Sequence, residues 1–79
     1  MLHTLFDLKP GESGTIIRIE GENRLKQRLA EMGFIRGASV ALDKVAPLGD
    51  PRAYTLQEYQ VSLRNEEAKS ILLEETTAP

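Results

Sequence analysis

The sequence contains no cysteine and no tryptophan, and it has only one histidine, two tyrosines and two phenylalanines among 79 residues. Without cysteine, the chain can form neither a disulfide nor a thiolate metal site. A chain of this length predicts one domain with one small core and no room for a large enclosed pocket. A small domain without cross-links must pack well or lean on a partner.

Groups that could carry catalysis are also scarce. His3 is the single histidine and lies close to the N-terminus, and no serine is accompanied by a base or a phosphate-loop motif. Carboxylates with helix or hairpin spacing do not converge on His3, so we expect no dedicated metal site, although a weak site stays open. The sequence therefore predicts no enzyme activity, no catalytic residue and no cofactor.

Long apolar runs are missing as well. No segment approaches the ~18 apolar residues of a membrane span, and Lys9 and Pro10 interrupt the first apolar residues too early for a signal peptide. We expect a soluble, cytoplasmic protein without direct membrane insertion. The net charge of −2 argues against a nucleic-acid binder. One basic cluster, either a contact patch or a solvated helix face, comprises Arg24, Lys26, Arg28 and Arg36.

A strand and a short helix are predicted in the first half. Residues 14–21 are rich in β-branched side chains and predict a strand, in which Ile16 is out of phase and indicates a bulge. Asn23 is the expected N-cap of the helix. Gly33 is expected to end it in a left-handed conformation, which would bring Phe34 against the last turn. The apolar stripe of this helix consists of Leu25, Leu29 and Met32.

The second half predicts mainly strands, so the fold class is mainly β with short helices. Val45 is out of phase with Val40 and Leu42, which indicates a second bulge. Several short strands in so few residues favour a small, strongly bent antiparallel barrel of about five strands. The expected elements are a strand over 38–47, a hairpin of 52–57 and 59–63, a helical turn over 64–70 with Asn65 as N-cap, and a strand over 71–74.

Residues 46–51, with the sequence APLGDP, form a stiff loop between two of these strands. Two prolines, a glycine and an aspartate restrict its backbone. Leu48 is the apolar residue at its tip. The loop is either a partner-binding element, because a stiff loop loses little entropy on binding, or a strand connection that needs its turn residues.

Four motifs in series resemble the FeoA family, ferrous iron transport protein A: LKPGESGTIIRI, RLAEMGFIRGASV, VAPLGDP and VSLRNEEAKSI. The resemblance runs from about residue 5 to 73, and it gives one domain over 1–75 with a frayed tail over 76–79. It implies an SH3-like barrel and a small cytosolic, non-enzymatic accessory whose partner is FeoB, a membrane permease. The alternative that it implies is a metal-linked regulatory domain, as at the C-terminus of iron-dependent repressors.

The resemblance also carries over individual positions. Glu58 departs from the family pattern, which often has glycine there, so the geometry of the hairpin turn is in doubt. The expected docking surface combines the stiff loop with the basic helix edge, and an alternative surface centres on residue 54. The partner-binding residues are thus Arg28, Arg36, Leu48, Asp50 and Tyr54. The structural positions are Gly11, Gly14, Leu29, Met32, Gly33, Gly37, Pro47, Gly49 and Pro51, with Ala46, Leu63, Arg64 and Ala68 also matching.

Overall fold

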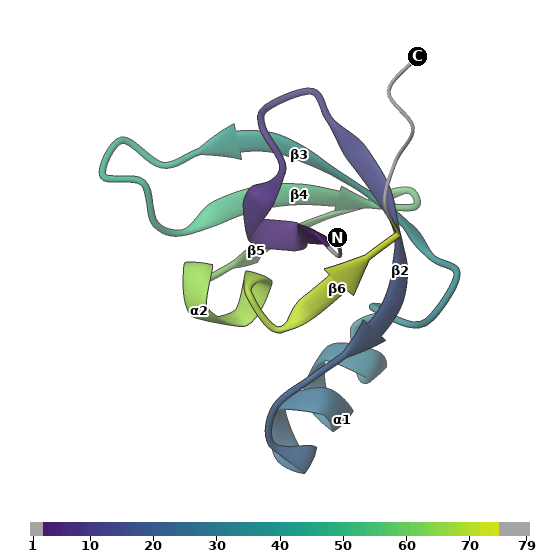
Figure 1. Ribbon diagram of the computed structural model, residues 1–79. Coiled ribbons are helices and arrows are strands. Elements are labelled where there is room, and N and C mark those ends of the chain that lie inside the picture. Colours follow the sequence, from purple (N-terminus) through teal and green to yellow (C-terminus); the bar gives the residue numbers. More distant parts are fainter. Residues whose placement is uncertain (1–2, 75–79) are drawn as a thin grey trace.

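The structure is a computed structural model that describes residues 3–74, and the tail expected at 76–79 lies outside them. Six strands and three short helices follow one another along the chain, and the arrangement is shown in Figure 1. In order, the elements are β1 (His3–Thr4), η1 (Leu5–Asp7), β2 (Ser13–Ile19), α1 (Asn23–Glu31), β3 (Ser39–Val45), β4 (Arg52–Leu56), β5 (Tyr59–Leu63), α2 (Asn65–Ala68) and β6 (Ile71–Leu73).

One bent sheet of six strands has the order β1-β6-β2-β3-β4-β5, and every neighbouring pair is antiparallel. The mainly β, antiparallel prediction is confirmed, but the expected closed barrel of about five strands is wrong. The order leaves β1 and β5 at the two ends of the sheet. The segment that follows β1 is tied to β4, because Arg52 Nη1 on β4 donates to the carbonyls of Phe6 and Leu8 at 2.9 and 3.2 Å.

Both predicted bulges are present. The β2–β6 register shifts between Ile16 and Arg18, so Ile19, beyond the shift, packs against the same core as Ile16, which is 1% exposed. The β3–β4 register shifts between Leu42 and Lys44, so Val45, which is 36% exposed, pairs with Arg52 and lies on the same face of the sheet as Leu42. An extra residue on one strand reverses which side chains point inward beyond it.

The bulge in β3 presents Asp43 to the two neighbouring strands. Its carboxylate accepts hydrogen bonds from the Thr55 hydroxyl of β4 and from Gln60 Nε2 of β5, the latter at 3.1 Å. These two donors, the hydroxyl first, hold the pKa of Asp43 below its ordinary value. Three consecutive strands are therefore tied together by one carboxylate.

The end of α1 is the predicted glycine cap. Gly33 has a φ of +105°, its N–H donates to the Ala30 carbonyl at 3.0 Å, and the Phe34 N–H donates to the Leu29 carbonyl at 3.0 Å. This pair of bonds is the Schellman arrangement. Leu29 and Phe34 are both fully buried in the same core cluster. The cap therefore directs the chain from the helix into the core, as predicted.

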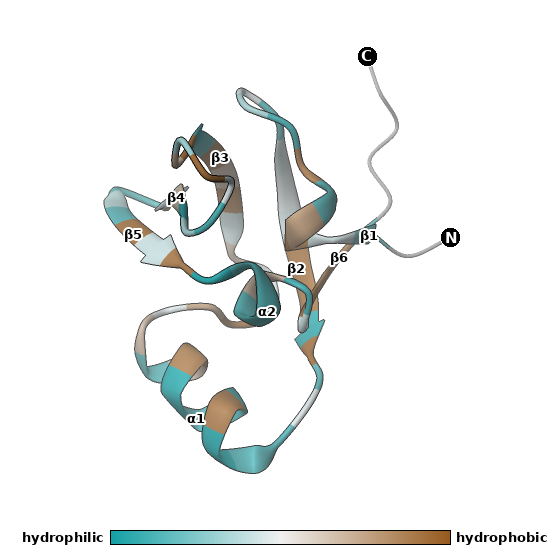
Figure 2. Cartoon of the chain, turned by 90° about the vertical axis from the view of Figure 1, so that its left-hand side faces the viewer, coloured by the Kyte–Doolittle hydropathy of each residue, from teal (hydrophilic) through white to brown (hydrophobic). Residues whose placement is uncertain are grey.

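Other expectations for α1 need correction. Its N-cap is Glu22 rather than Asn23, and no side chain caps it. Leu25 packs partly against the core, but Met32 is 38% exposed, so the buried stripe is narrower than predicted. Figure 2 shows the apolar residues of α1 as brown bands between teal polar ones.

The hairpin turn between β4 and β5 contains Gln57 and Glu58. The left-handed conformation falls on Gln57, with φ +60°, and not on Glu58. Glu58 therefore does not carry the backbone strain that we expected there, because the residue with a positive φ is the preceding Gln57.

The core lies inside the bent sheet and under η1 and α2. Gly14 of β2 is needed for its packing, since a Cβ there would lie 2.9 Å from Leu73 Cδ1 on β6. None of the helices within residues 3–74 is long and apolar enough to cross a membrane. The buried apolar residues are Leu5, Ile16, Leu29, Phe34, Ala38, Val40, Leu42, Tyr54, Leu56, Leu63, Ala68, Ile71 and Leu73.

Candidate partner-binding site

The loop of residues 46–51 projects from the body of the molecule between β3 and β4, at the left of Figure 1. Leu48 at its tip is 96% exposed. The loop is nevertheless fixed, because the Gly49 N–H donates to the Ala46 carbonyl at 2.7 Å and the Ala46 N–H donates to the Pro51 carbonyl at 3.1 Å. Gly49 has a φ of +89°, which a residue with a side chain would resist.

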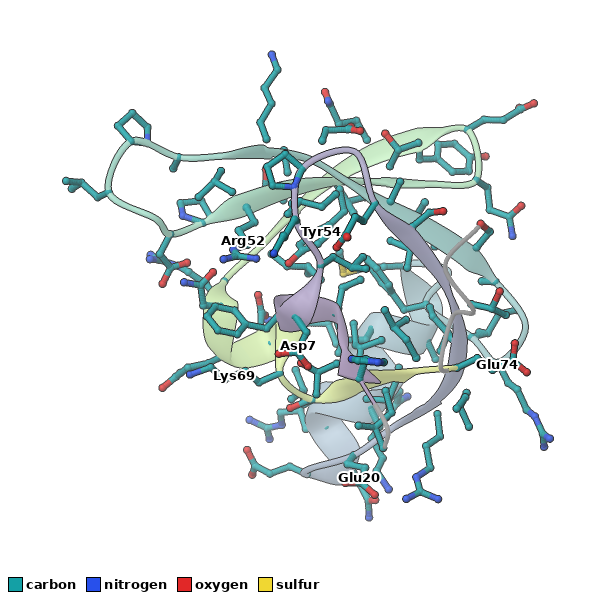
Figure 3. All side chains as sticks on the ribbon, turned by 45° about the horizontal axis from the view of Figure 1, so that its top comes forward. Asp7, Glu20, Arg52, Tyr54, Lys69 and Glu74 are labelled. Carbon is teal, nitrogen blue, oxygen red and sulfur yellow. The ribbon has the colours of Figure 1, made fainter. Side chains whose placement is uncertain are left out.

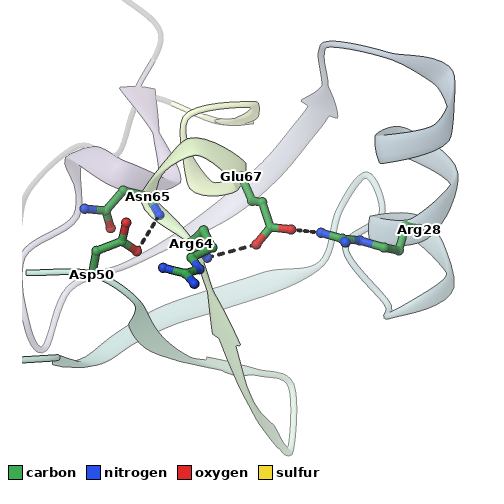
Figure 4. Close-up of polar contacts among 5 residues, drawn as sticks. All are labelled: Arg28, Asp50, Arg64, Asn65 and Glu67. Carbon is green, nitrogen blue, oxygen red and sulfur yellow. Dashed lines mark hydrogen bonds and ion pairs between the residues drawn. The ribbon is translucent and has the colours of Figure 1, made fainter.

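Helix α2 holds this loop through hydrogen bonds of its first residue, Asn65. The backbone N–H of Asn65 donates to Asp50 Oδ1 at 3.0 Å, and its side-chain Nδ2 donates to the Gly49 carbonyl at 2.9 Å. Figure 4 shows Asn65 facing Asp50. We predicted Asn65 as the N-cap of α2. Asn65 instead supports the loop. Asp50 was expected to contact a partner, but its Oδ1 is engaged inside the molecule.

The N-cap of α2 is Arg64, and Glu67 Oε1 accepts from the Arg64 N–H at 2.9 Å. The other oxygen, Oε2, forms an ion pair with Arg28 of α1 (Figure 4). The Arg28 side chain is 58% exposed and that of Glu67 is 19% exposed. Polar contacts thus run from α1 through α2 to the loop, and the charge of Arg28 is largely taken up within the molecule.

Arg36 is exposed in the connection between α1 and β3. It precedes the first residue of β3, whereas the loop follows the last. A strand of seven residues puts its ends about 20 Å apart, at about 3.3 Å per residue. The loop and Arg36 therefore lie at opposite ends of β3, and that one partner contacts both stays a prediction.

Tyr54 was predicted at the centre of an alternative surface, and this prediction is also wrong because its side chain is fully buried. It points inward from β4 together with Leu56, two residues further on. Burial is the main cause that raises the pKa of its phenol above the ordinary value.

Two further features bear on binding. A shallow recess of about 210 Å³ on α1 is lined by Glu22, Arg24, Leu25 and Arg28, so two residues of the basic cluster border it. Within residues 3–74, no group of three or more His, Cys, Asp or Glu side chains is placed to hold a metal ion.

Sequence reasoning missed the roles of Asn65 and Glu67. Both lie in RNEEAKS, which we interpreted as a helical turn with a local cap. Their contacts with loop 46–51 and with α1 join residues 15 and 39 positions apart, and no local pattern signals them. The exposure of Leu48 agrees with the expectation for the loop tip.

The sequence profile of the FeoA domain matches residues 3–75. A Porphyromonas gingivalis (strain ATCC BAA-308 / W83) protein, the Fe(2+) transport protein A/Fe(2+) transporter FeoB fusion protein, is 40% identical over 70 residues. These residues are 89% of this chain and 8% of the fusion protein, so the chain spans a small part of that relative.

Two solved structures share the fold. An FeoA-like protein from Clostridium acetobutylicum, solved by NMR, has a TM-score of 0.85 and 34% identity, covering 92% of this chain and 85% of its own. Stenotrophomonas maltophilia FeoA, an SH3 domain protein solved with zinc, has a TM-score of 0.80 and 25% identity, covering 91% and 89%. The predicted FeoA resemblance and SH3-like fold are thus confirmed, with the sheet open rather than closed.

Proposed function

The chain belongs to the FeoA domain family, and on this premise we propose that it is a cytoplasmic, non-catalytic accessory of bacterial ferrous iron uptake. It docks on the cytosolic part of a FeoB-type transporter. The docking contact centres on Leu48, and loop 46–51 holds Leu48 in a fixed position.

The observation that carries this proposal is the combination of exposure and fixation at the loop tip. A single exposed leucine is ordinary on a protein surface. Leu48, however, is 96% exposed on a loop whose neighbouring residues are held by Asn65 and by the bonds that close the loop. A fixed apolar side chain enters a partner's pocket with little loss of conformational entropy. Such buried anchors carry much of the binding energy of an interface.

The relative from Porphyromonas gingivalis supports the choice of partner. In that protein, an Fe(2+) transport protein A segment and the FeoB transporter form one chain. A covalent link raises the effective concentration of one part near the other, which is useful where the two bind each other. We propose the same association for the present chain.

The test is a binding measurement between the full chain and the purified cytosolic region of the FeoB-type transporter from the same cell. Leu48→Asp should weaken the affinity at least tenfold, which is about 1.4 kcal/mol, and reduce ferrous uptake in cells. Ile35→Asp is the matched control, because Ile35 is 55% exposed and lies beyond the other end of β3. It should change the affinity less than twofold.

Circular dichroism and melting curves of both variants should match those of the unmodified chain. Loss of folded structure in Leu48→Asp would mean that the tip packs into the body in solution. Unchanged affinity in Leu48→Asp would place the docking surface elsewhere.

A further inference from the structure

Strand β5 forms one end of the sheet, and its outer edge pairs with no other strand of residues 3–74. The strand at the other end, β1, has only two residues. A long exposed edge is a template for pairing with another chain, and proteins usually protect it with charges, a proline or a bulge. The sequence of β5, YQVSL, has no charged residue and no proline, and its register with β4 is unbroken. The edge of β5 is therefore open to a further strand.

The direction of the backbone groups of β5 follows from the contacts on the other side of β4. The Gln57 N–H, directly after β4, donates to the Ser39 carbonyl of β3 at 3.3 Å. Successive residues of a strand direct their N–H and C=O groups to alternate sides. Because Gln57 faces β3, Leu56 and Tyr54 direct their backbone groups toward β5.

The partners of these two residues on β5 are Tyr59 and Val61, which therefore direct their own backbone groups toward β4. Gln60 and Ser62 alternate with them, so their N–H and C=O groups point away from the sheet. Both residues are exposed. The Gln60 side chain does not cover the edge, because its Nε2 donates back across the sheet to Asp43 of β3 at 3.1 Å.

The side chains of β5 continue the inner face of the sheet. Val61 pairs with Tyr54, which is fully buried and labelled in the interior in Figure 3, so Tyr59, Val61 and Leu63 lie on the inner face. Leu63 is buried and Val61 packs partly against the core, but Tyr59 is 69% exposed. A strand added at this edge would cover the exposed ring of Tyr59.

Two copies of β5 fit each other in an antiparallel register. Such a pair requires residues with outward-pointing backbone groups to lie opposite each other. When Val61 lies opposite the partner's Val61, Gln60 lies opposite the partner's Ser62, and these two exchange hydrogen bonds. Tyr59 then lies opposite the partner's Leu63, and such aromatic–aliphatic pairs stabilise a sheet.

The charged residues that flank β5 select this register. Glu58 precedes the strand and Arg64 follows it in extended conformation, and both are exposed. With Val61 at the centre, Glu58 of each copy lies opposite the partner's Arg64, which is favourable. The two neighbouring registers that keep the outward-pointing groups together would put Glu58 opposite the partner's Ser62 or the partner's Glu66 instead.

We propose that two copies of this chain pair through β5 and form a symmetric antiparallel dimer centred on Val61. The two sheets then continue into one, and an ion pair of Glu58 with the partner's Arg64 closes each end of the contact. Because the contact is twofold, it uses the open edge of both copies and ends with the dimer. This surface lies on the hairpin of β4 and β5, and the proposal does not depend on the docking of Leu48.

The first test is the mass of the full chain in analytical ultracentrifugation. The chain has a mass of 8.8 kDa, and the measured mass should approach twice this value as the concentration rises to about 1 mM. Ser62→Pro removes an outward N–H, which an edge strand tolerates, and should weaken the dimer about tenfold or more. Ser62→Ala keeps this N–H and should dimerise like the unmodified chain.

A chain that stays monomeric at about 1 mM overturns the proposal and leaves the edge to an extended segment of another protein. A dimer that Ser62→Pro does not weaken also overturns it.

The second test exchanges the flanking charges, and it stands even if the proline variant fails to fold. Arg64→Glu and Glu58→Arg each put like charges opposite each other, so each should weaken the dimer about threefold or more at low salt. The double variant restores opposite charges and should dimerise like the unmodified chain. Single variants without effect, or a double variant no better than the single ones, contradict the register and overturn the proposal.

The third test is amide hydrogen exchange at low and high protein concentration, which locates the contact. The amides of Gln60 and Ser62 should exchange more slowly as the dimer forms. The control is the amide of Arg24 in the first turn of α1, where N–H groups have no partner within the helix, and its rate should not change. A dimer in which Gln60 and Ser62 exchange as fast as in the monomer overturns the proposal.

Discussion

Arg28 on α1 and Glu67 on α2 form the ion pair that connects α1 to the part of the molecule that holds loop 46–51. Because Glu67 also caps α2 through Arg64, one carboxylate fixes the start of one helix and the position of another. Leu29 is the only residue within α1 that is fully buried in the described chain. The ion pair is therefore a polar contact that adds to the burial of Leu29 in positioning this helix.

The first prediction concerns that pair. In a double-mutant cycle of Arg28→Gln and Glu67→Gln, the coupling free energy should be about 0.2–1 kcal/mol, and it should fall as salt is added because the pair is partly exposed. Denaturant unfolding at low and high salt measures both. Glutamine at position 67 keeps an acceptor for the cap, so the cycle isolates the charge interaction. A coupling of zero at low salt would mean that apolar packing alone holds α1.

The second prediction concerns Asn65. Asn65→Ala removes the bond to the Gly49 carbonyl and should destabilise the protein by about 0.5–1.5 kcal/mol. It should also lower the NMR order parameters of residues 47–50. Asn23→Ala is the control, because Asn23 is exposed and does not cap α1, and it should change stability by less than about 0.5 kcal/mol. If the order parameters stay unchanged, the prolines and the bonds within the loop suffice to fix it.

The third prediction concerns Gly33. Gly33→Val should lower the free energy of unfolding by about 1–3 kcal/mol, since a β-branched residue resists the observed positive φ. The new Cβ would also lie 3.1 Å from Leu56 Cδ2. Ala30→Val places the same side chain on the exposed face of α1 and should cost much less. Equal unfolding midpoints for the two variants would contradict the observed cap.

The fourth prediction concerns pH. The pKa of Asp43 is lower in the folded protein than its ordinary value of 3.8, mainly through the Thr55 hydroxyl. The carboxylate therefore contributes stability above the unfolded pKa, and this contribution is lost as the pH falls through the folded pKa. NMR titration should give an Asp43 pKa below 3.8. Thr55→Val should move that pKa upward and reduce the loss of stability between pH 7 and pH 3. An Asp43 pKa above 3.8 would mean that the hydroxyl does not donate to it in solution.

The fifth prediction concerns iron. Under anaerobic conditions, calorimetry with Fe²⁺ should show no stoichiometric site tighter than about 1 μM, or ~8 kcal/mol, because residues 3–74 contain no clustered ligand set. The control for any observed heat is His3→Ala. A tight site would favour the alternative of a metal-linked regulatory domain.

Local patterns in the sequence predicted local geometry well. The Gly33 cap and both bulges follow from residues within a few positions of each other, because a glycine conformation and a strand phase are short-range properties. Tyr54 and Leu56 are two residues apart in one strand and therefore lie on the same face. This spacing already indicated that Tyr54 points inward. We expected the opposite because the phase of a strand does not say which face is buried.

The remaining features depend on long-range contacts. β1 has two residues and exists because it pairs with β6, which no propensity within two residues can indicate. The supports of loop 46–51 come from α2, and the link to α1 comes from Glu67, so both appear only once the chain is folded. Sequence analysis therefore identified the exposed tip of the candidate site but not what holds it.

The pairing of His3 with Leu73 has a practical consequence. It brings the two ends of the described chain to neighbouring strands, so a short linker between them would span only a small gap. A circular permutant with new ends at the exposed turn of Gln57 and Glu58 should keep the core and loop 46–51 intact. Such a permutant would move the attachment point of a fluorescent label or a fused domain to the hairpin between β4 and β5, with every residue that supports Leu48 left in place.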